Sequence, residues 1–379
     1  MPDRQARMRA ARLYGDAGPP PGPARSKGTV MTAPERTWPR LLAALLARED
    51  LTADDTCWAM TEVMDDACEP AQLAAFLTAL RAKGETAAEL GGMLDALMDR
   101  VIPLPVDGSA VTDVVGTGGD GGHTVNISTM AALVTAAAGT RVVKHGGRSV
   151  SSKSGSADVI EALGIPLDLS PAQVARCVTE IGIGFTFAPN YHHGLRHAAP
   201  VRRALGVPTA INYLAPLTNP ARPGTALIGC SSLAVAPVLA AVLAGRGATA
   251  LVVRGHDGLD EITTAAPTDL WTATAEGVRK TVFDTARFGL RRASPGDLAG
   301  GDAACNAKVV RSVAAGEPGP VLDAVLANAA GALAARSAGA FEDAFAAGLD
   351  QARTAVSSGA AARLLDQWIA LAVELADPR

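Results

Sequence analysis

The sequence contains a glycine-rich run, residues 116–122, directly after the apolar pair Val114 and Val115. Glycine leaves the backbone N–H groups uncovered and tolerates positive φ, so this glycine loop can wrap an anion with main-chain donors. A helix starting near residues 126–129 would add its dipole. The run matches neither GxGxxG nor the Walker A pattern, because no Lys-Ser or Lys-Thr pair follows it. Taken alone, it fits an anion site and a simple chain-reversing turn equally well.

The second group is the stretch 144–156, called here the cationic loop, which follows the apolar pair Val142 and Val143. It holds three cations, five serines and three glycines in thirteen residues. At an effective dielectric near 20, one cation ~4 Å from a phosphate oxygen contributes about 4 kcal/mol before desolvation. A solvated surface loop is the plain alternative, but such a loop has no need to begin at the end of a buried strand. The composition therefore favours phosphate binding.

The third group, residues 254–261, follows an apolar run and ends in the adjacent carboxylates Asp260 and Glu261. Mg²⁺ prefers few carboxylates, completed by water and substrate oxygens. An acidic turn by itself is more often only solvated. Beside two anion-binding loops, this acidic turn instead predicts a magnesium-bound polyphosphate substrate.

The fourth group, the histidine segment (residues 190–203), contains three histidines within six residues. A metal site is disfavoured there because no carboxylate or thiol lies at ligand spacing within the segment. A helical interpretation is better, with Arg202 or Arg203 offered to a carboxylate as a two-pronged donor. A surface helix with paired charges is the alternative.

The elements that must position these groups differ between the two ends of the chain. Between residues 38 and 100 apolar residues recur at helical spacing, which predicts four short helices. Thr52 and Thr86 are the expected N-caps of two of them, and Pro103 and Pro105 form a linker.

After Val111 short apolar runs alternate with glycine-rich turns and helical stretches. The expected strands are 114–115, 142–143, 227–229 and 250–253, and the expected helices are 131–138 and 233–244. Such alternation predicts an α/β fold with a mostly parallel sheet, which binds ligands at the carboxyl ends of its strands.

Composition excludes several classes of protein. Hydrophobic residues make up 48% of the 379 and aromatic residues only 4%, which favours packed helices and buried parallel strands. A formal net charge of −4 gives no general attraction to nucleic acid. The longest apolar run, near residues 233–245, contains Pro237 and is shorter than the ~20 residues of a membrane span.

Five scattered cysteines without a close pair favour reduced thiols in the cytoplasm. Residues 1–35, rich in Pro, Gly and Arg near the start, predict a disordered extension, and the functional chain would then start near Met31. The expected division is a helical domain over 36–105, joined by helices near 190–214, and an α/β domain over 106–379 that binds the substrate and carries out catalysis.

In this order the motifs resemble the anthranilate phosphoribosyltransferase family of tryptophan biosynthesis, from about Trp38 to the C-terminus. The resemblance rests on the glycine loop, the cationic loop, the acidic turn and the segments 126–129, 187–189, 201–203 and 216–220. It implies a small all-helical domain plus a larger α/β domain of the nucleoside-phosphorylase-like type, in a homodimer formed through the helical domain. The implied substrates are 5-phosphoribosyl 1-pyrophosphate and anthranilate or a similar aromatic acid, with Mg²⁺ as cofactor.

The resemblance also implies roles for individual residues. The donor would be bound by Gly116, Gly119, Asp120, Thr124, Asn126, Ser128, Thr129, Lys144, Arg148, Ser151, Ser152 and Ser156. Their neighbours Ile127, His145, Gly146, Gly147, Ser149 and Val150 complete this expected donor set. The acceptor would meet Gly116, Gly147 and Arg202, and Mg²⁺ would be held by Ser128, Asp260 and Glu261.

Four positions depart from the family pattern, all on the acceptor side. Gly147 stands where the family has an asparagine that contacts anthranilate, and His193 stands where a proline is typical. Tyr213 and Ala215 interrupt the usual Asn-Leu-Leu-Gly-Pro stretch. Losing a polar contact typically costs about 0.5–1.5 kcal/mol, so these changes predict a weaker acceptor complex or a different aromatic acid.

The expected chemistry needs no covalent intermediate and no strong base, because an aryl amine is unprotonated at neutral pH. Catalysis would be orientation and charge stabilisation. His145 could accept the proton that the amine loses, and a structural role is equally open. Three other functions stay open: transfer to another aromatic acid, a nucleoside phosphorylase, and a non-catalytic protein that only binds the donor.

Overall fold

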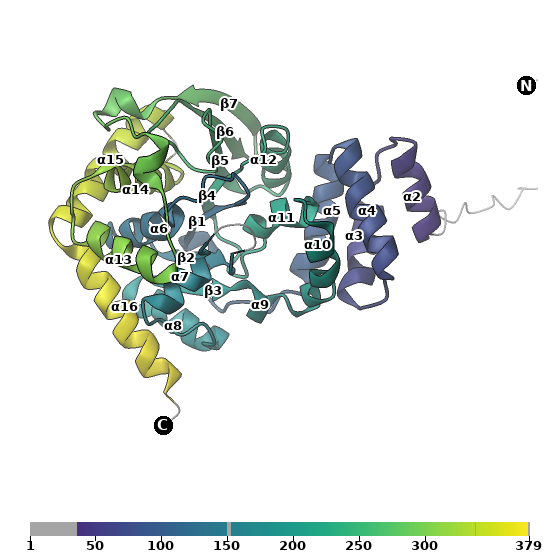
Figure 1. The fold of residues 1–379 in the computed structure, drawn as a ribbon, viewed down its shortest axis with the longest axis horizontal. Coiled ribbons are helices and arrows are strands. Elements are labelled where there is room, and N and C mark those ends of the chain that lie inside the picture. The colour runs from purple at the N-terminus through teal and green to yellow at the C-terminus, as the bar shows by residue number, and fades with distance from the viewer. Residues whose placement is uncertain (1–35, 150–152, 338, 378–379) are drawn as a thin grey trace, which may run out of the picture. The chain divides into compact units, whose positions relative to one another are not determined.

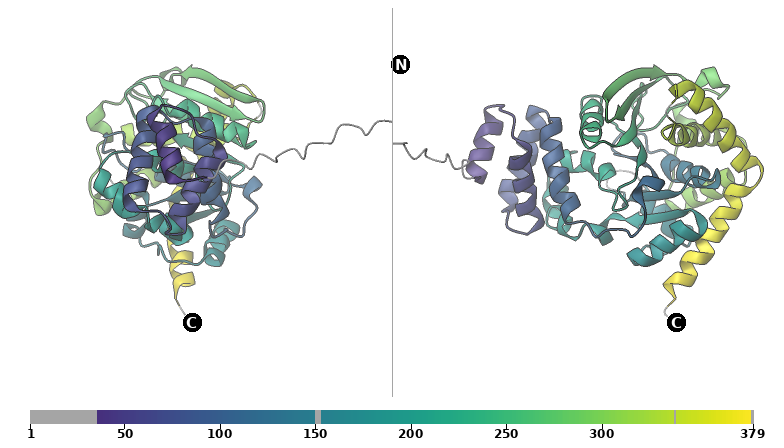
Figure 2. Two further views of the ribbon diagram at one scale, coloured as in Figure 1. Left: turned by 90° about the vertical axis from the view of Figure 1, so that its right-hand side faces the viewer. Right: turned by 180° about the vertical axis from the view of Figure 1, so that it is seen from behind.

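The computed structural model describes residues 36–149, 153–337 and 339–377, so the predicted disordered extension over 1–35 lies outside the described residues. Four helices come first along the described chain (Figure 1). They are α2 (Trp38–Leu46), α3 (Ala53–Met64), α4 (Pro70–Lys83) and α5 (Ala87–Asp99). Both views in Figure 2 show them stacked side by side, and the sequence prediction of four helices is confirmed.

The predicted N-caps of this bundle are confirmed. Thr52 accepts a hydrogen bond from the backbone N–H of Asp55, and Thr86 accepts one from that of Glu89. Each carboxylate reaches back to the N–H of its threonine, so both helix starts form capping boxes. The interior of the bundle is buried and aromatic at one end, where the Trp38 ring lies 5.8 Å from the ring of Phe76.

The remainder of the described chain is built on one seven-stranded sheet with the order β3-β2-β1-β4-β5-β6-β7. The strands are β1 (Thr112–Gly116), β2 (Val142–Gly146), β3 (Ile183–Phe187), β4 (Thr225–Gly229), β5 (Thr249–Gly255), β6 (Thr268–Thr274) and β7 (Gly277–Phe283). The first five run parallel, whereas β6 and β7 are antiparallel additions. The predicted mostly parallel sheet is therefore confirmed.

The crossover helices explain why the sheet is buried. Helix α6 (Ile127–Ala137) connects β1 to β2, and α12 (Ala236–Gly245) connects β4 to β5. The two connections run in opposite directions along the sheet, so right-handed crossovers place these helices on opposite faces. The point between β1 and β4, where the strand order reverses, is where such sheets bind ligands.

Two predicted helices have different starts in the structure. The helix expected at 131–138 begins at Ile127, and the helix expected at 233–244 begins at Ala236. Pro237 lies in the first turn of α12, where its fixed φ suits a helix start, and Leu233 ahead of it is exposed. Apolar periodicity alone does not mark these boundaries.

Further helices complete the fold and cover the sheet (Figure 1). They are α7 (Ser156–Ala162), α8 (Pro171–Ile181), α13 (Ala303–Ala314), α14 (Pro320–Ala334), α15 (Phe341–Ser357) and α16 (Ala360–Ala376). Between β3 and β4 lie the short pieces α9 (Ala188–Tyr191), α10 (Ala199–Leu205) and α11 (Ala210–Leu214), and the latter two contact α4. Thr37 onward forms one compact unit. Within the described residues, no helix combines the length and apolar character needed to cross a membrane.

Glu89, fully buried in the bundle, joins three segments. Its Oε1 accepts a hydrogen bond from the N–H of Leu51 at 2.9 Å, and its Oε2 accepts one from the N–H of Thr86 at 2.8 Å. The Lys83 ammonium lies 3.0 Å from the same Oε2 and 2.7 Å from Asp50, whose side chain is 68% exposed.

We expect Glu89→Ala to lower the free energy of unfolding by about 3–5 kcal/mol, because it removes the buried carboxylate that pairs with Lys83 and leaves the N–H groups of Leu51 and Thr86 without that acceptor. Asp50→Ala removes the exposed partner of the same lysine and should cost less than about 1 kcal/mol. Denaturant unfolding of both variants measures the difference. Equal losses would contradict the role given to Glu89.

Candidate active site

The glycine loop and the acidic turn meet at the reversal point of the sheet. Gly116 and Gly229 are register partners on β1 and β4, and the main chain of Asp260 lies against both. A Cβ on Gly116 would stand 2.4 Å from the Asp260 carboxylate, and one on Gly229 would stand 1.6 Å from the Asp260 carbonyl oxygen. The backbone N–H of Gly118 donates to Oδ2 of Asp260 at 2.7 Å. Two motifs 142 residues apart are thus directly bonded.

The cationic loop begins beside this junction. Lys144, at the end of β2, is 2% exposed and donates from Nζ to the Val114 carbonyl at 2.7 Å and to the Ser128 hydroxyl at 3.3 Å. Burial lowers the pKa of Lys144, while the nearby carboxylates Asp113 and Glu261 raise it. Its ammonium therefore lies under the start of α6, between the first strand end and the acidic turn.

Asp260 and Glu261 are buried side by side, and their charges are poorly compensated. Burial, followed by the charge of Asp120, raises the pKa of Asp260 to about 7. Burial and the neighbouring Asp260 raise the pKa of Glu261 well above its usual range, against the lowering effect of Lys144. The Ser128 backbone N–H also bonds Glu261. A carboxylate pair with this excess of negative charge fits a divalent cation.

The described residues contain no group of three or more His, Cys, Asp or Glu side chains placed to enclose a metal. Mg²⁺ itself needs few protein ligands, because water and phosphate oxygens complete its shell. Glu261 lies beside the start of α6, where it accepts from the Ser128 N–H and where the Ser128 hydroxyl accepts from Lys144.

The start of α6 is bonded to the cationic loop and to α13. Asn126 donates to the Ser154 carbonyl at 3.1 Å and accepts from the amide of Asn306 at 2.8 Å. The hydroxyl of Thr129 is buried with no hydrogen-bond partner, whereas Ile127 points into the core. Thr124, half-buried, pairs as an isolated bridge with the chain near α13.

The described part of the cationic loop is closed by Asp158, on the first turn of α7. Its Oδ2 accepts hydrogen bonds from the N–H of Ser149 at 3.1 Å and of Gly155 at 2.8 Å. Gly146 packs so closely that a Cβ there would stand 2.1 Å from the Ser156 hydroxyl. The predicted donor residues Val150, Ser151 and Ser152 lie outside the described residues.

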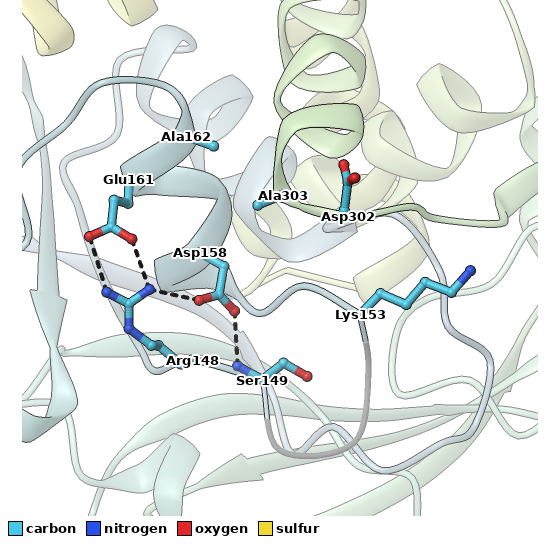
Figure 3. Close-up of a pocket in the computed structure, with 8 residues that line it drawn as sticks. All are labelled: Arg148, Ser149, Lys153, Asp158, Glu161, Ala162, Asp302 and Ala303. Atoms are coloured by element: carbon cyan, nitrogen blue, oxygen red, sulfur yellow. Dashed lines mark hydrogen bonds and ion pairs between the residues drawn. The ribbon is translucent and has the colours of Figure 1, made fainter.

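Arg148 makes contacts other than those the sequence predicts. Its guanidinium bonds Asp158 at 2.9 Å and binds Glu161 through two hydrogen bonds, at 2.8 and 3.0 Å (Figure 3). These carboxylates raise its pKa. A cavity of about 650 Å³ opens beside this ion pair, lined also by Lys153 and Asp302. Neither Asp260 nor Glu261 lines this cavity.

His145 is held between two threonines. Its Nδ1 lies 2.9 Å from the hydroxyl of Thr186 and its Nε2 lies 3.3 Å from that of Thr218. Burial, with the neighbouring His192, lowers the pKa of His145 to about 3. The ring is thus neutral and has both nitrogens engaged, which favours the structural role over proton transfer.

A buried network that the sequence motifs did not indicate lies beneath His145. Asp113, within β1, accepts from the N–H of His145 at 3.3 Å and from the Asn219 side chain at 2.8 Å. Asn219 also donates to the Val143 carbonyl at 2.8 Å. Burial raises the pKa of Asp113 to about 6. The only sequence signal was a charged residue inside an apolar strand.

The histidine segment does not gather its histidines around a common point. His192 is buried and its Nε2 lies 2.8 Å from the Thr218 carbonyl, His193 is exposed, and His197 pairs with Asp66 at 2.8 Å. Arg202 is the notable cation of this segment, because its Nε is buried with no hydrogen-bond partner, whereas Arg203 is exposed.

Burial lowers the pKa of Arg202, as expected for a guanidinium without a counter-ion. Tyr213, one of the residues that departs from the family pattern, is buried. The Arg81 guanidinium carbon lies 5.1 Å from the centroid of its ring. Among the described residues, no atom lies within 4 Å of the position that a Cβ on Gly147 would take, so there is open space at this position.

Comparison with known proteins agrees with this architecture. Residues 39–101 match the helical bundle domain of a glycosyl transferase family, and residues 108–362 match the a/b domain of the same family. The chain is 57% identical to an anthranilate phosphoribosyltransferase of Salinispora arenicola over 89% of this chain and 97% of that protein, and 53% identical to one of Saccharopolyspora erythraea over 89% and 97%.

Solved structures of similar fold carry the same name. The crystal structure of the anthranilate phosphoribosyltransferase of Thermus thermophilus superposes with a TM-score of 0.81 at 35% identity, covering 88% of this chain and 99% of that one. The Saccharomyces cerevisiae enzyme in complex with PRPP and Mg gives a TM-score of 0.80 at 27% identity over 90% and 99%. The chain belongs to the glycosyl transferase family that joins a helical bundle to an a/b domain, with the anthranilate phosphoribosyltransferases as its relatives.

Proposed function

We propose that this protein transfers the phosphoribosyl group of 5-phosphoribosyl 1-pyrophosphate to the amine of anthranilate and releases pyrophosphate, a step of tryptophan biosynthesis. The observation that carries the proposal is the direct bond between Gly118 in the glycine loop and Asp260 in the acidic turn, with buried Lys144 beside them. Main-chain donors, a cation and a carboxylate pair are thereby combined where the sheet binds ligands. A magnesium-bound diphosphate ester needs all three.

Mg²⁺ would be held by Asp260, Glu261 and the Ser128 hydroxyl, and when bound it would neutralise charge on the pyrophosphate. A related yeast enzyme was solved with PRPP and Mg. We propose that Lys144 and N–H groups of the glycine loop attract the same leaving group as the bond to C1 of the ribose breaks. The donor residues implied by the resemblance remain a proposal. Arg148 binds Glu161 in the structure and would have to leave it to take part.

The acceptor site is proposed around Arg202. Its buried Nε has no partner in the described structure, and a carboxylate is the anion that matches a guanidinium in shape and charge. A related yeast enzyme was solved with 4-fluoroanthranilate, an aromatic amino acid of this kind. With the acid bound at one end, the amine would face the ribose, while His145 fixes the loop and takes no proton.

Gly147 favours a second candidate function, transfer to a different aromatic acid. Its surroundings are open, so a larger or differently substituted ring has room there. We also propose that the protein acts as a homodimer in the cytoplasm. The exposed Leu46 on α2 supports the dimer, and the five free cysteines support the cytoplasmic location. The domain boundary is proposed near residue 105, between the two matched family segments.

The function is tested by incubating the protein with 5-phosphoribosyl 1-pyrophosphate, Mg²⁺ and a panel of aminobenzoic acids, and by measuring the pyrophosphate released. We expect turnover with anthranilate and its loss when EDTA removes the metal. Turnover only with another acid would establish the second candidate. Phosphate-dependent nucleoside cleavage would identify a phosphorylase, and donor binding without turnover would identify a binding protein.

Gly147→Asn should lower KM for anthranilate about threefold to tenfold, because it supplies one polar contact in open space. The backbone at Gly147 is not in the left-handed region, so the substitution adds no strain. Steady-state kinetics with varied anthranilate measures the change. Gly182→Asn, at a left-handed glycine in a distant helix cap, is the control for general effects. An unchanged KM would remove Gly147 from the acceptor site.

The affinity for Mg²⁺ together with the donor should rise as pH increases through about 7. Asp260 has a raised pKa of about 7, so below that value a proton occupies the carboxylate that the cation needs. Cation binding then releases a proton, which calorimetry in buffers of different ionisation enthalpy detects. Asp260→Asn should weaken binding and abolish this rise. A pH-independent affinity in the unmodified protein would contradict the assignment.

A further inference from the structure

The loop after β4, residues 230–232, has no role in the site as derived above, yet it contacts the glycine loop. Ser231 donates from its hydroxyl to the Gly118 carbonyl at 2.8 Å. Its backbone N–H donates to the Thr117 hydroxyl at 3.1 Å, which itself lies 3.1 Å from the same carbonyl. Thr117 in turn donates its N–H to the Gly229 carbonyl at 3.0 Å.

These contacts fix the plane of one particular peptide. The carbonyl of Gly118 and the N–H of Gly119 belong to the same planar group and point to opposite sides. Ser231 holds that carbonyl, so the N–H of Gly119 is directed away from Ser231. Within the described residues, this N–H has no hydrogen-bond partner. The Gly119 N–H is therefore available to donate a hydrogen bond to a ligand.

The Gly118 carbonyl is held by two hydroxyls, with Ser231 at 2.8 Å and Thr117 at 3.1 Å, and losing the shorter contact would loosen this peptide. Gly118 and Gly119 have φ values of +65° and +79°, which glycine reaches and leaves at little cost, and both are exposed. Asp260 fixes the preceding peptide through the N–H of Gly118 at 2.7 Å. The Ser231 hydroxyl fixes the following one, and a donor group ordered in advance binds with a smaller loss of entropy.

Arg254 holds Ser231 in turn. From the end of β5 its Nε donates to the Ser231 carbonyl at 3.0 Å, and its Nη1 donates to the Gly255 carbonyl at 3.2 Å. The guanidinium thus spans the ends of β4 and β5 and sets the position of the residue-231 backbone.

We propose that Ser231, supported by Arg254, is a positioning residue for the donor: it aims the Gly119 N–H at the pyrophosphate of 5-phosphoribosyl 1-pyrophosphate. This inference rests on the proposed function for the identity of the ligand. It adds the loop after β4 to the three strand-end loops already assigned.

The test is calorimetric titration of the full chain with the donor and Mg²⁺, combined with steady-state kinetics. Ser231→Ala should raise the donor Kd and KM about fivefold, the usual effect of losing one hydrogen bond, with kcat at saturating donor unchanged. Ser231→Thr keeps the hydroxyl and should restore the donor Kd. Ser232→Ala is the matched control, because that neighbouring hydroxyl bonds Tyr213 and leaves the glycine loop untouched.

The proposal is overturned if Ser231→Ala binds the donor as the unmodified protein does, or if Ser231→Thr binds as weakly as Ser231→Ala. It is also overturned if Ser232→Ala weakens binding as much. A protein that binds the donor but transfers it to no acid refutes the proposed function alone, since the Kd comparison still decides the role of Ser231. A protein that does not bind the donor refutes both.

Discussion

The close approach of the Asp260 main chain to the two central strands is the constraint on which the site depends. It is possible only because Gly116 and Gly229, paired in register, have no side chains. Any Cβ at these positions would overlap Asp260 and push the acidic turn outward. With the turn in place, its carboxylate reaches Gly118, and Glu261 comes within the field of Lys144. The sheet therefore aligns Gly116 with Gly229, and the absence of side chains at these two glycines allows Asp260 to contact both strands.

Much of this site was predictable because its residue types are unusual in their setting. Glycines after a buried strand, and adjacent carboxylates after another, have few structural uses, and parallel topology brings such strand ends together. Ser231 and Asn219 carry no such signal, since serine and asparagine are ordinary loop residues. Their roles depend on which carbonyl or carboxylate they face, and that is decided by the packing of segments more than 70 residues apart.

Arg148 illustrates a second limit of sequence reasoning. A cation in a glycine-rich loop has several anions within reach, and the residue type does not say which one it contacts. Here α7 offers Asp158 and Glu161, and the guanidinium binds both. The fold has a comparable limit. The alternation of strands and helices predicts the mostly parallel sheet, but no apolar run predicts the antiparallel hairpin of β6 and β7.

Asp260 has two tasks that share one carboxylate. Its Oδ2 accepts the N–H of Gly118 in the glycine loop, so a cation held by Asp260 and a diphosphate bound by that loop would be coupled through a single carboxylate. Thermodynamic reciprocity then requires that whatever effect one ligand has on the affinity for the other be returned by the same factor. Metal and sugar diphosphate would enter as a cooperative pair, and the affinity measured for either one alone would understate the selectivity of the protein for their complex.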